Sequence, residues 1–405
     1  MSGPALPSFE SLDVDNRRVL LRVDFNVPLR GRGDSREVAD DSRIRAALPT
    51  IEALLARDAR LIICSHLGRP KGKVDPEQSL APVAGHLAKL LDRPVRLPDE
   101  VVGDGVTKLV NDTRAGEIVL LENLRFHPGE EKNDPDFARA LAKLCDAYVN
   151  DAFGASHRAH ASVVGVPAVV HDHAPGLLMT AELAALGRLV EDIERPFVAV
   201  VGGAKVSDKL GILVALTERL AAGDSIVIGG AMANTFLLAQ GHELGASRVE
   251  RERLNDCKRV FDKAAARDVQ VVLPVDLRCG AGLDSREAQV VEVEAGVPEG
   301  QLALDIGPRS EARFSGAIAG AKTLFWNGPM GVFENPAFAS GTMAVAAAVA
   351  ACSGYTVVGG GDSVAALNLS GKADAINHIS TGGGASLEFV EGRELPGVVA
   401  LAIAD

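Results

Sequence analysis

Charged and amide side chains follow the short apolar runs of the first half of the chain, and one more, Arg43, lies where a helix is expected to begin. The side chains in question are Asp24, Asn26, Arg43, His66, Arg69, Arg125 and Arg158. A single arginine after a strand is usually a solvated loop residue, and Asp24 alone could form an Asx turn. Several such residues behind successive runs are harder to explain in this way, because guanidinium groups bind carboxylate and phosphate in a bidentate manner. The pattern predicts a pocket for a small ligand that bears both kinds of anion.

Glycine clusters follow the apolar runs of the second half. The segments concerned contain Gly202, Gly203, Lys205, Lys209, Gly229, Gly230, Asn327, Gly328, Pro329, Gly360, Gly361, Asp362, Ser363, Gly382, Gly383 and Gly384. Glycine lets a backbone approach a ligand closely, and a helix N-terminus offers free N–H groups to phosphate oxygens. Lys205 and Lys209 are four residues apart and would share one face of a helix. None of these segments has the spacing of a Walker A motif or of G-x-G-x-x-G, which disfavours a standard P-loop ATPase and a standard dinucleotide dehydrogenase.

Asp362 admits two interpretations. It follows a run of three glycines and precedes Ser363 at the expected start of a helix. There its carboxylate could cap the helix, or it could hold a magnesium ion that bridges phosphates. The residues alone favour the cap.

Short β-branched runs alternate with helix-like segments along the whole chain. The runs are Val19–Val23, Leu61–Cys64, Ile118–Leu121, Ala147–Val149, Phe197–Val201, Ser225–Ile228, Val269–Leu273, Thr323–Trp326, Tyr355–Val358 and Ala375–Ser380. Such alternation predicts parallel sheets with helices on both faces, and ligands then bind beyond the carboxyl ends of the strands. We expect two doubly wound, Rossmann-like α/β domains, residues 1–175 and 176–392, joined by a helix at Met179–Ile193.

Composition narrows the class of protein. The net charge of −12 and an aromatic content of 4% disfavour nucleic-acid binding, and the charge also disfavours anionic membranes. Five scattered cysteines without a C-x-x-C pair indicate reduced thiols in a cytoplasmic protein. The N-terminus lacks the features of a signal peptide, and the longest apolar run, Met343–Cys352, is too short to cross a bilayer. We therefore expect a cytoplasmic protein without membrane or nucleic-acid partners.

Taken together, these segments resemble the phosphoglycerate kinase family. R-V-D-F-N-V-P-L at 22–29, S-H-L-G-R-P-K-G-K at 65–73, L-L-E-N-L-R-F at 120–126 and N-D-A-F-G-A-S-H-R-A-H at 150–160 resemble its substrate half. G-G-A-K-V-S-D-K at 202–209, W-N-G-P-M-G-V-F-E at 326–334, G-G-G-D-S at 359–363 and S-T-G-G-G-A at 380–385 resemble its nucleotide half. The chain departs at Arg309-Ser310, where a lysine and a threonine are expected, although charge and hydroxyl are kept. The segment Arg278–Gly280 is also atypical, and we assign it no role.

The resemblance implies reversible phosphoryl transfer between 1,3-bisphosphoglycerate and ADP, giving 3-phosphoglycerate and ATP, with Mg²⁺ on the nucleotide. The implied phosphoglycerate ligands are Asp24, Asn26, Arg43, His66, Arg69, Arg125 and Arg158. The implied nucleotide ligands are Gly203, Lys205, Gly229, Gly230, Asn327, Pro329, Glu334 on the ribose, Gly360, Gly361, Asp362 and Ser363. Asp362 becomes the magnesium ligand, which reverses the preference for a cap. Lys209 and the turn of Gly382, Gly383 and Gly384 would meet the phosphates.

The chemistry of this reaction fits the residues present. The attacking group is a carboxylate that is already ionised at neutral pH, so no general base is needed. This fits the sequence, in which no Ser–His or Cys–His pairing is obvious that could serve as such a base. What remains is electrostatic stabilisation of the transferring group, for which Arg43 and Lys205 are the candidates. The alternatives are an NAD-dependent dehydrogenase, which would need G-x-G-x-x-G, and a non-enzymatic nucleotide-binding scaffold.

The expected architecture has one further consequence. If each domain binds one reactant, the domains must close around the pair, with hinges near Met179–Ile193 and Gly392–Pro396. The resemblance implies that residues 393–405 return to the first domain. We expect a monomer.

Overall fold

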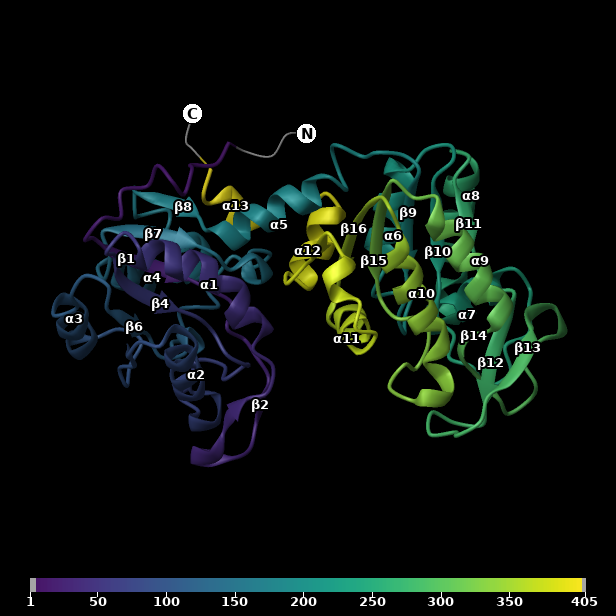
Figure 1. Cartoon of the computed structure of the whole chain (residues 1–405), viewed down its shortest axis with the longest axis horizontal. Helices are drawn as coiled ribbons and strands as arrows, with labels where there is room; N and C mark the ends of the chain where they lie inside the picture. Colours follow the sequence, from purple (N-terminus) through teal and green to yellow (C-terminus); the bar gives the residue numbers. More distant parts are fainter. Residues whose placement is uncertain (1–4, 403–405) are drawn as a thin grey trace. The chain divides into compact units, whose positions relative to one another are not determined.

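The chain folds into two compact units. The computed structural model describes residues 5–402 of the 405-residue chain. One unit holds residues 5–184 and 394–402, and the other holds Ala185–Arg393 (Figure 1). Each unit contains a six-stranded parallel sheet with helices on both faces, which confirms the predicted α/β class. Among the described residues, none of the helices is long and apolar enough to span a membrane.

The sheet of the first unit has the strand order β5-β6-β4-β1-β7-β8, and every pair of neighbours is parallel. The strands are β1 (Arg18–Arg22), β4 (Arg60–Cys64), β5 (Val95–Arg96), β6 (Ile118–Leu120), β7 (Ala147–Asn150) and β8 (His173–Pro175). A short hairpin, β2 (Leu29–Arg30) and β3 (Glu37–Val38), follows β1. The apolar runs predicted four of the six sheet strands. β5 and β8 were missed because β5 has only two residues and β8, His-Ala-Pro, contains no β-branched or apolar run.

Alternate residues of each strand enter opposite cores of the first unit. Val19 and Leu21 lie in one core cluster, whereas Leu20 lies in the other, as the two-residue period of a strand requires. The first core is covered by α1 (Ser42–Leu55) and α2 (Ala81–Leu91). The second is covered by α3 (Asp104–Asn111), α4 (Pro135–Ala142) and a π-helical turn at Ala161–Gly165. The C-terminal segment with α13 (Pro396–Val399) also packs here: Gly397 N–H donates to Ser156 O at 2.8 Å, and Leu401 is buried.

Helix α5 (Leu177–Gly187) begins in the first unit and is shorter than the predicted Met179–Ile193. Its first turn is capped by Asp151, the residue after β7, whose Oδ1 accepts the Met179 N–H at 3.1 Å. Thr50 Oγ1 accepts the Leu177 N–H at 3.0 Å. The helix ends at Gly187, a poor helix former. Burial raises the pKa of Asp151 to about 6.

This pKa leads to a stability prediction for Asp151→Asn. The amide keeps an acceptor oxygen for the α5 cap but removes the charge. A carboxyl group whose folded pKa is raised stabilises the fold below its unfolded value of 3.8, and that contribution is lost as the pH rises through about 6. The stability of the variant relative to the parent should therefore increase by about 2–3 kcal/mol between pH 4 and 7 and stay level above it. Urea unfolding of both proteins across this range measures the difference; a difference that does not change with pH would contradict the assignment.

The sheet of the second unit has the strand order β11-β10-β9-β15-β16-β17, again with parallel neighbours. The strands are β9 (Phe197–Val201), β10 (Ser225–Ile228), β11 (Gln270–Val272), β15 (Thr323–Asn327), β16 (Tyr355–Gly359) and β17 (His378–Ile379). The predicted strand at Ala375–Ser380 was too long. Ala373–Ala375 forms a 3₁₀ turn instead, so that only two residues remain for the edge strand.

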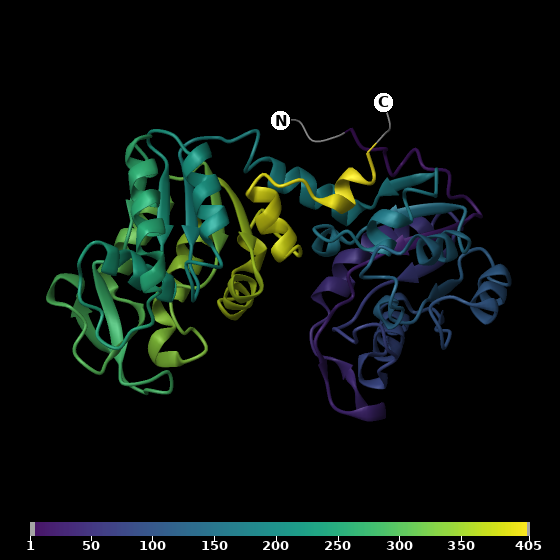
Figure 2. The ribbon, with the colours of Figure 1, turned by 180° about the vertical axis from the view of Figure 1, so that it is seen from behind.

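Two groups of helices cover the faces of this sheet. The helices α9 (Pro308–Ala319), α10 (Ser340–Ala351) and α11 (Gly361–Leu369) pack on Val198, Val200 and Trp326 (Figure 1). The view from behind shows α6 (Leu210–Arg219), α7 (Gly230–Ala239) and α8 (Leu254–Ala265) on the opposite side (Figure 2). The short α12 (Gly384–Val390) packs against α6.

A second, smaller sheet in this unit was not predicted. The strands β12 (Asp276–Gly280), β13 (Gln289–Glu292) and β14 (Leu302–Ile306) pair antiparallel in the order β13-β12-β14. In β12 the buried Leu277 and Cys279 alternate with the less buried Arg278, so there is no continuous apolar run to detect. The atypical segment Arg278–Gly280 thus forms part of a strand.

Candidate functional sites

The carboxyl edge of the first sheet brings Asp24, Arg43 and His66 together. Arg43, at the start of α1, donates from Nη1 to Asp24 Oδ2 at 2.8 Å. His66 Nδ1 lies 4.0 Å from Asp24 Oδ1. The His66 ring is nearly inaccessible, whereas the Arg43 side chain keeps about a third of its surface exposed (33%). Arg43 is thus held by Asp24 while part of its guanidinium side chain stays accessible to a bound anion.

Asn26 and Arg125 meet the same turn of backbone. Asn26 Oδ1 accepts the Gly68 N–H at 2.9 Å, and Arg125 Nη1 donates to Gly68 O at 2.6 Å. Arg125 is almost fully buried, with Glu131 3.1 Å from its Nε. Arg69, the next residue of the turn, is exposed. The structure therefore places five of the seven predicted residues in one contact network and Arg69 beside it.

Arg158, the seventh residue, is linked to this cluster by charge. It donates from Nε to His157 Nε2 at 3.1 Å. Burial first, and then the positive charge of Arg158, lower the pKa of Arg125. Burial and the charges of Arg22, Arg125 and Arg158 likewise hold the pKa of His66 well below its usual value. The positive charges of these arginines therefore repel one another, and a bound anion would relieve that repulsion.

Sequence reasoning missed Arg22 and Glu130. Arg22 is fully buried at the end of β1, and its Nη2 donates to His66 Nδ1 at 3.2 Å. Because a guanidinium can only donate, the neutral His66 ring carries its proton on Nε2. Arg22 Nε also donates to Ser162 Oγ at 2.8 Å, and Ser162 Oγ donates to the buried Glu130 at 2.6 Å. The signal was present: Arg22 is the one charged residue inside the apolar run Val19–Val23 that was taken as a strand.

His160 completes the buried group around Glu130. Its Nδ1 lies 3.8 Å from Glu130 Oε1. Burial and the charges of Arg125, Arg22 and Arg158 nevertheless lower the pKa of His160 to about 3. His66 and His160 are therefore neutral at pH 7, and the arginines supply the positive charge of the cluster.

In the second unit, the predicted helical face shared by Lys205 and Lys209 was wrong. Residues 202–209 form a loop that ends in a turn at 207–209, and α6 begins at Leu210. Lys205 is exposed in this loop, whereas Lys209 is half-buried and donates to Asn327 Oδ1. Burial lowers the pKa of Lys209. The two lysines thus have different environments and different partners.

The glycines after β9, β10 and β15 let three turns pack against one another. Gly203 N–H donates to Pro329 O at 3.1 Å, and Gly230 N–H donates to Met330 O at 3.0 Å. A Cβ at Gly202 would lie 2.2 Å from Pro329 O, and Gly230 has a φ of +69°. The N–H groups of Gly203 and Gly230 are already used by the protein backbone. Gly202, Gly203, Gly229 and Gly230 with Pro329 thus form a closely packed surface, the glycine floor, against which a ligand could lie.

The turn after β16 differs, because it opens toward solvent. Gly361 and Asp362 are the first residues of α11 and are exposed, and a Cβ at Gly361 would meet no atom within 4 Å. The helix has Gly360 as its N-cap, without a side-chain cap, so Asp362 does not cap it. Ser363 is buried, and its Oγ accepts the Gly328 N–H at 2.5 Å. Gly382–Gly384 similarly leads into α12, and a Cβ at Gly383 would meet no atom within 4 Å.

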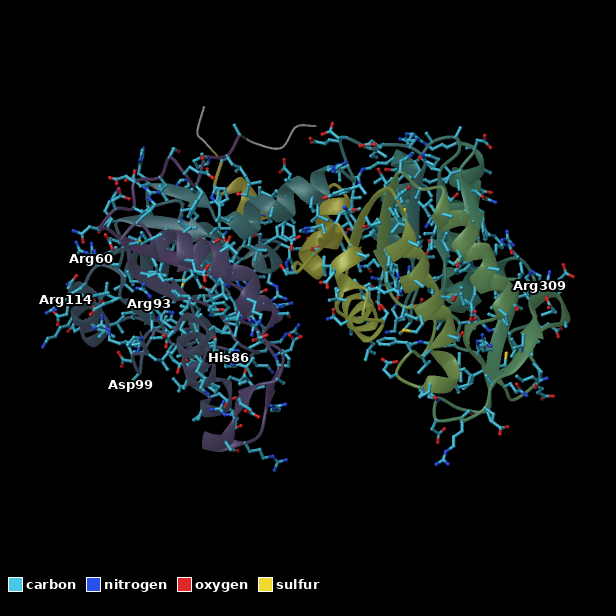
Figure 3. All side chains as sticks on the ribbon, in the orientation of Figure 1. Arg60, His86, Arg93, Asp99, Arg114 and Arg309 are labelled. Carbon is cyan, nitrogen blue, oxygen red and sulfur yellow. The ribbon has the colours of Figure 1, made fainter. Side chains whose placement is uncertain are left out.

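Three other predicted or atypical positions have simple locations. Glu334 is exposed in a turn after β15. Arg309 extends from the start of α9 at the surface and pairs with Glu292 at 2.5 Å (Figure 3). Ser310 is buried, and its Oγ donates to Asp276 Oδ1 at 2.6 Å. Ser310, at the position where a threonine is expected, therefore has a structural role: its hydroxyl links α9 to β12.

One unit carries a cluster of arginines suited to a small anion. The other carries closely packed glycine turns and, at Gly361, the solvent-exposed N-terminus of α11. This combination defines a two-domain α/β phosphotransferase that acts on a small anionic metabolite.

Comparison with known proteins identifies the family. The family model for phosphoglycerate kinase matches residues 9–393. A phosphoglycerate kinase of Anaeromyxobacter sp. (strain K) is 53% identical over 398 residues, 98% of this chain and 99% of the relative. One of Moorella thermoacetica is 54% identical over 395 residues, 97% of this chain and 98% of the relative. The structure of phosphoglycerate kinase from Coxiella burnetii superposes with a TM-score of 0.87 at 40% identity, covering 98% of this chain and 99% of its own.

The chain belongs to the phosphoglycerate kinase family. It is a phosphotransferase with a carboxyl group as acceptor, in the glycolytic reaction between 1,3-bisphosphoglycerate with ADP and 3-phosphoglycerate with ATP.

Proposed function

We propose that the first unit binds the phosphoglycerate and the second binds the nucleotide, and that the phosphoryl group passes directly between them. The observation that carries this proposal is the group of Arg43, Arg125 and Arg158 with the neutral His66 at one sheet edge. Because His66 is neutral, the cluster offers guanidinium forks and the His66 Nε2–H to a ligand that bears both carboxylate and phosphate. Asp24 and Asn26 orient Arg43 and the Gly68 turn.

In the second unit, the nucleotide phosphates would lie at the start of α11. Gly360 and Gly361 allow close approach, Asn327 and Ser363 hold the turns, and Gly203, Gly229, Gly230 and Pro329 form the floor. Glu334 would bind the ribose. Lys209 and the turn of Gly382, Gly383 and Gly384 would contact the phosphates.

Magnesium fits this arrangement at Asp362. The Asp362 carboxylate is exposed and does not cap its own helix, and a hard cation prefers such oxygen ligands, completing its shell with phosphate oxygens and water. When bound, magnesium would neutralise phosphate charge and polarise the transferring group. Asp362 is the residue that we propose to hold it.

The transfer needs no covalent intermediate on the enzyme. The acceptor carboxylate is ionised at neutral pH, so the residues have only to position the reactants and neutralise developing charge. Arg43 and Lys205 are the cations that we assign to the transferring group. The enzyme would act as a monomer in the cytoplasm. Closure of the domains stays a prediction, which solution scattering without ligand, with each ligand and with both would test.

A coupled assay with 3-phosphoglycerate and MgATP tests the proposal. We expect turnover that requires both substrates and magnesium and yields ADP in proportion to 1,3-bisphosphoglycerate. Absence of turnover by folded protein that still binds nucleotide would support the scaffold alternative. Hydride transfer to NAD would support the dehydrogenase alternative.

A further inference from the structure

The carboxylate of Glu250 holds the loop that carries Lys205. Ser207 N–H donates to Glu250 Oε2 at 3.1 Å, and Ser207 Oγ donates to Glu250 Oε1 at 2.6 Å. The Val206 N–H also donates to this carboxylate. Both carboxylate oxygens are therefore bound to the two residues that directly follow Lys205.

Glu250 is itself fixed to the core of the second unit. Its own N–H donates to Oγ1 of Thr235, a buried residue of α7, at 3.1 Å. Next to Thr235 on the same helix, Asn234 Nδ2 donates to Arg248 O at 3.5 Å. Residues 248–250 thus lie along α7, and Glu250 transmits the position of that helix to the Lys205 loop.

Besides Glu250, the buried side chain of Val206 and backbone hydrogen bonds near both ends hold this loop. At the start, Gly202 N–H donates to Asn327 O at 2.9 Å. At the end, the Lys209 N–H donates to Val206 O at 2.9 Å and leads into α6. Between these points Ala204 and Lys205 are exposed, so their side chains have little packing to fix them.

Charge supports the same connection. Burial acts to raise the pKa of Glu250, but the Ser207 hydrogen bonds, the Val206 N–H and the charge of Lys205 outweigh it, and the pKa is lowered. Glu250 is therefore an anion near neutral pH, and the positive charge of Lys205 contributes to lowering its pKa.

We infer that Glu250 is a positioning residue that sets the place of Lys205 for phosphoryl transfer, acting through Ser207 and Val206. The inference rests on the proposed function, in which Lys205 neutralises the transferring group. Catalysis by a fixed charge depends steeply on its position, because a displacement of about 1 Å can cost about a hundredfold in rate. Loss of the tether should therefore affect turnover more than ground-state binding.

The first test is Glu250→Ala with Glu252→Ala as control. Glu252 is exposed two residues further along the chain. We expect Glu250→Ala to lower kcat about tenfold, because the Lys205 loop loses its hydrogen bonds to the Glu250 carboxylate. KM for the phosphoglycerate substrate should change little, because that substrate binds in the other unit. Glu250→Gln, which keeps an acceptor, should recover part of the rate, and Glu252→Ala should match the parent. If Glu250→Ala does not fold, Ser207→Ala removes one bond of the tether and should lower kcat by a smaller factor. Unchanged kcat in both Glu250→Ala and Ser207→Ala would overturn the inference.

A double-mutant cycle separates positioning from a general structural role. If Glu250 acts through Lys205, adding Glu250→Ala to Lys205→Ala should lower kcat by much less than the tenfold expected alone. A full loss of about tenfold in that background would show that Glu250 acts elsewhere, and the inference would fail while the proposed function stands. If Lys205→Ala alone had parental kcat, the role proposed for Lys205 would fail instead.

Discussion

Replacing Arg43 by alanine should lower kcat by at least about a hundredfold, which corresponds to about 3 kcal/mol of lost transition-state stabilisation. Arg43 is held by Asp24 at 2.8 Å, yet a third of its side chain (33%) stays exposed at the ligand edge of the sheet. A preorganised cation of this kind stabilises the transition state more than the ground state, because negative charge develops near it during transfer. KM for the phosphoglycerate substrate should rise by a smaller factor, since the other arginines of the cluster remain.

Arg45→Ala is a matched control for this experiment. Arg45 lies two residues further along α1, is more exposed and pairs with Asp41 at 2.9 Å. Its replacement should leave kcat near the parental value. Steady-state kinetics of both variants, with 3-phosphoglycerate and MgATP varied in turn, gives the comparison. A parental kcat with only a raised KM for Arg43→Ala would mean that Arg43 binds ground state and transition state equally.

The grouping of these polar residues could be predicted because parallel strands place their carboxyl ends at one edge. Asn26 and Arg125 are about a hundred residues apart in the chain, yet the neighbouring strands β1, β4 and β6 bring both to the Gly68 turn. A residue type and its place after a strand were sufficient for this. The identity of each hydrogen-bond partner was not needed.

Arg22 could not be recognised in the same way. It belongs to the strand itself, and its function depends on which buried groups face it across the sheet. The counter-charge of Glu130 reaches it through Ser162, from segments far apart in the sequence. A network of this kind is a property of packing, and no spacing rule within one segment encodes it.

The glycines show a second feature that the sequence pattern could not resolve, namely which glycines pack inside the protein and which are exposed. The same residue type serves backbone packing at Gly202 and an exposed helix start at Gly361. Only the surroundings distinguish the two roles. The face that Lys205 and Lys209 would share on a helix failed for a similar reason, because the hydrogen bonds from Ser207 to Glu250 stabilise a loop at that point.

Asp362→Asn should raise the magnesium concentration needed for half-maximal activity by at least about tenfold, and weaken MgATP binding with it. The amide oxygen remains, but the charge that attracts a hard cation is lost. Because Asp362 is exposed and is not the cap of α11, the free energy of unfolding should change by less than about 0.5 kcal/mol. Titration calorimetry with MgATP and with metal-free ATP measures the first effect, and thermal unfolding measures the second.

Asp374→Asn provides the control for the loss of a carboxylate in the same unit. Asp374 is also exposed and also lies in the first turn of a helical segment, Ala373–Ala375, so its replacement changes net charge and helix electrostatics to a similar extent. Its magnesium requirement should equal that of the parent. The difference between the two variants isolates metal binding from any general effect of charge, because Asp362 follows the open Gly360-Gly361 turn and Asp374 does not. An equal and small response of both variants would show that the ion is held by the nucleotide and water without Asp362.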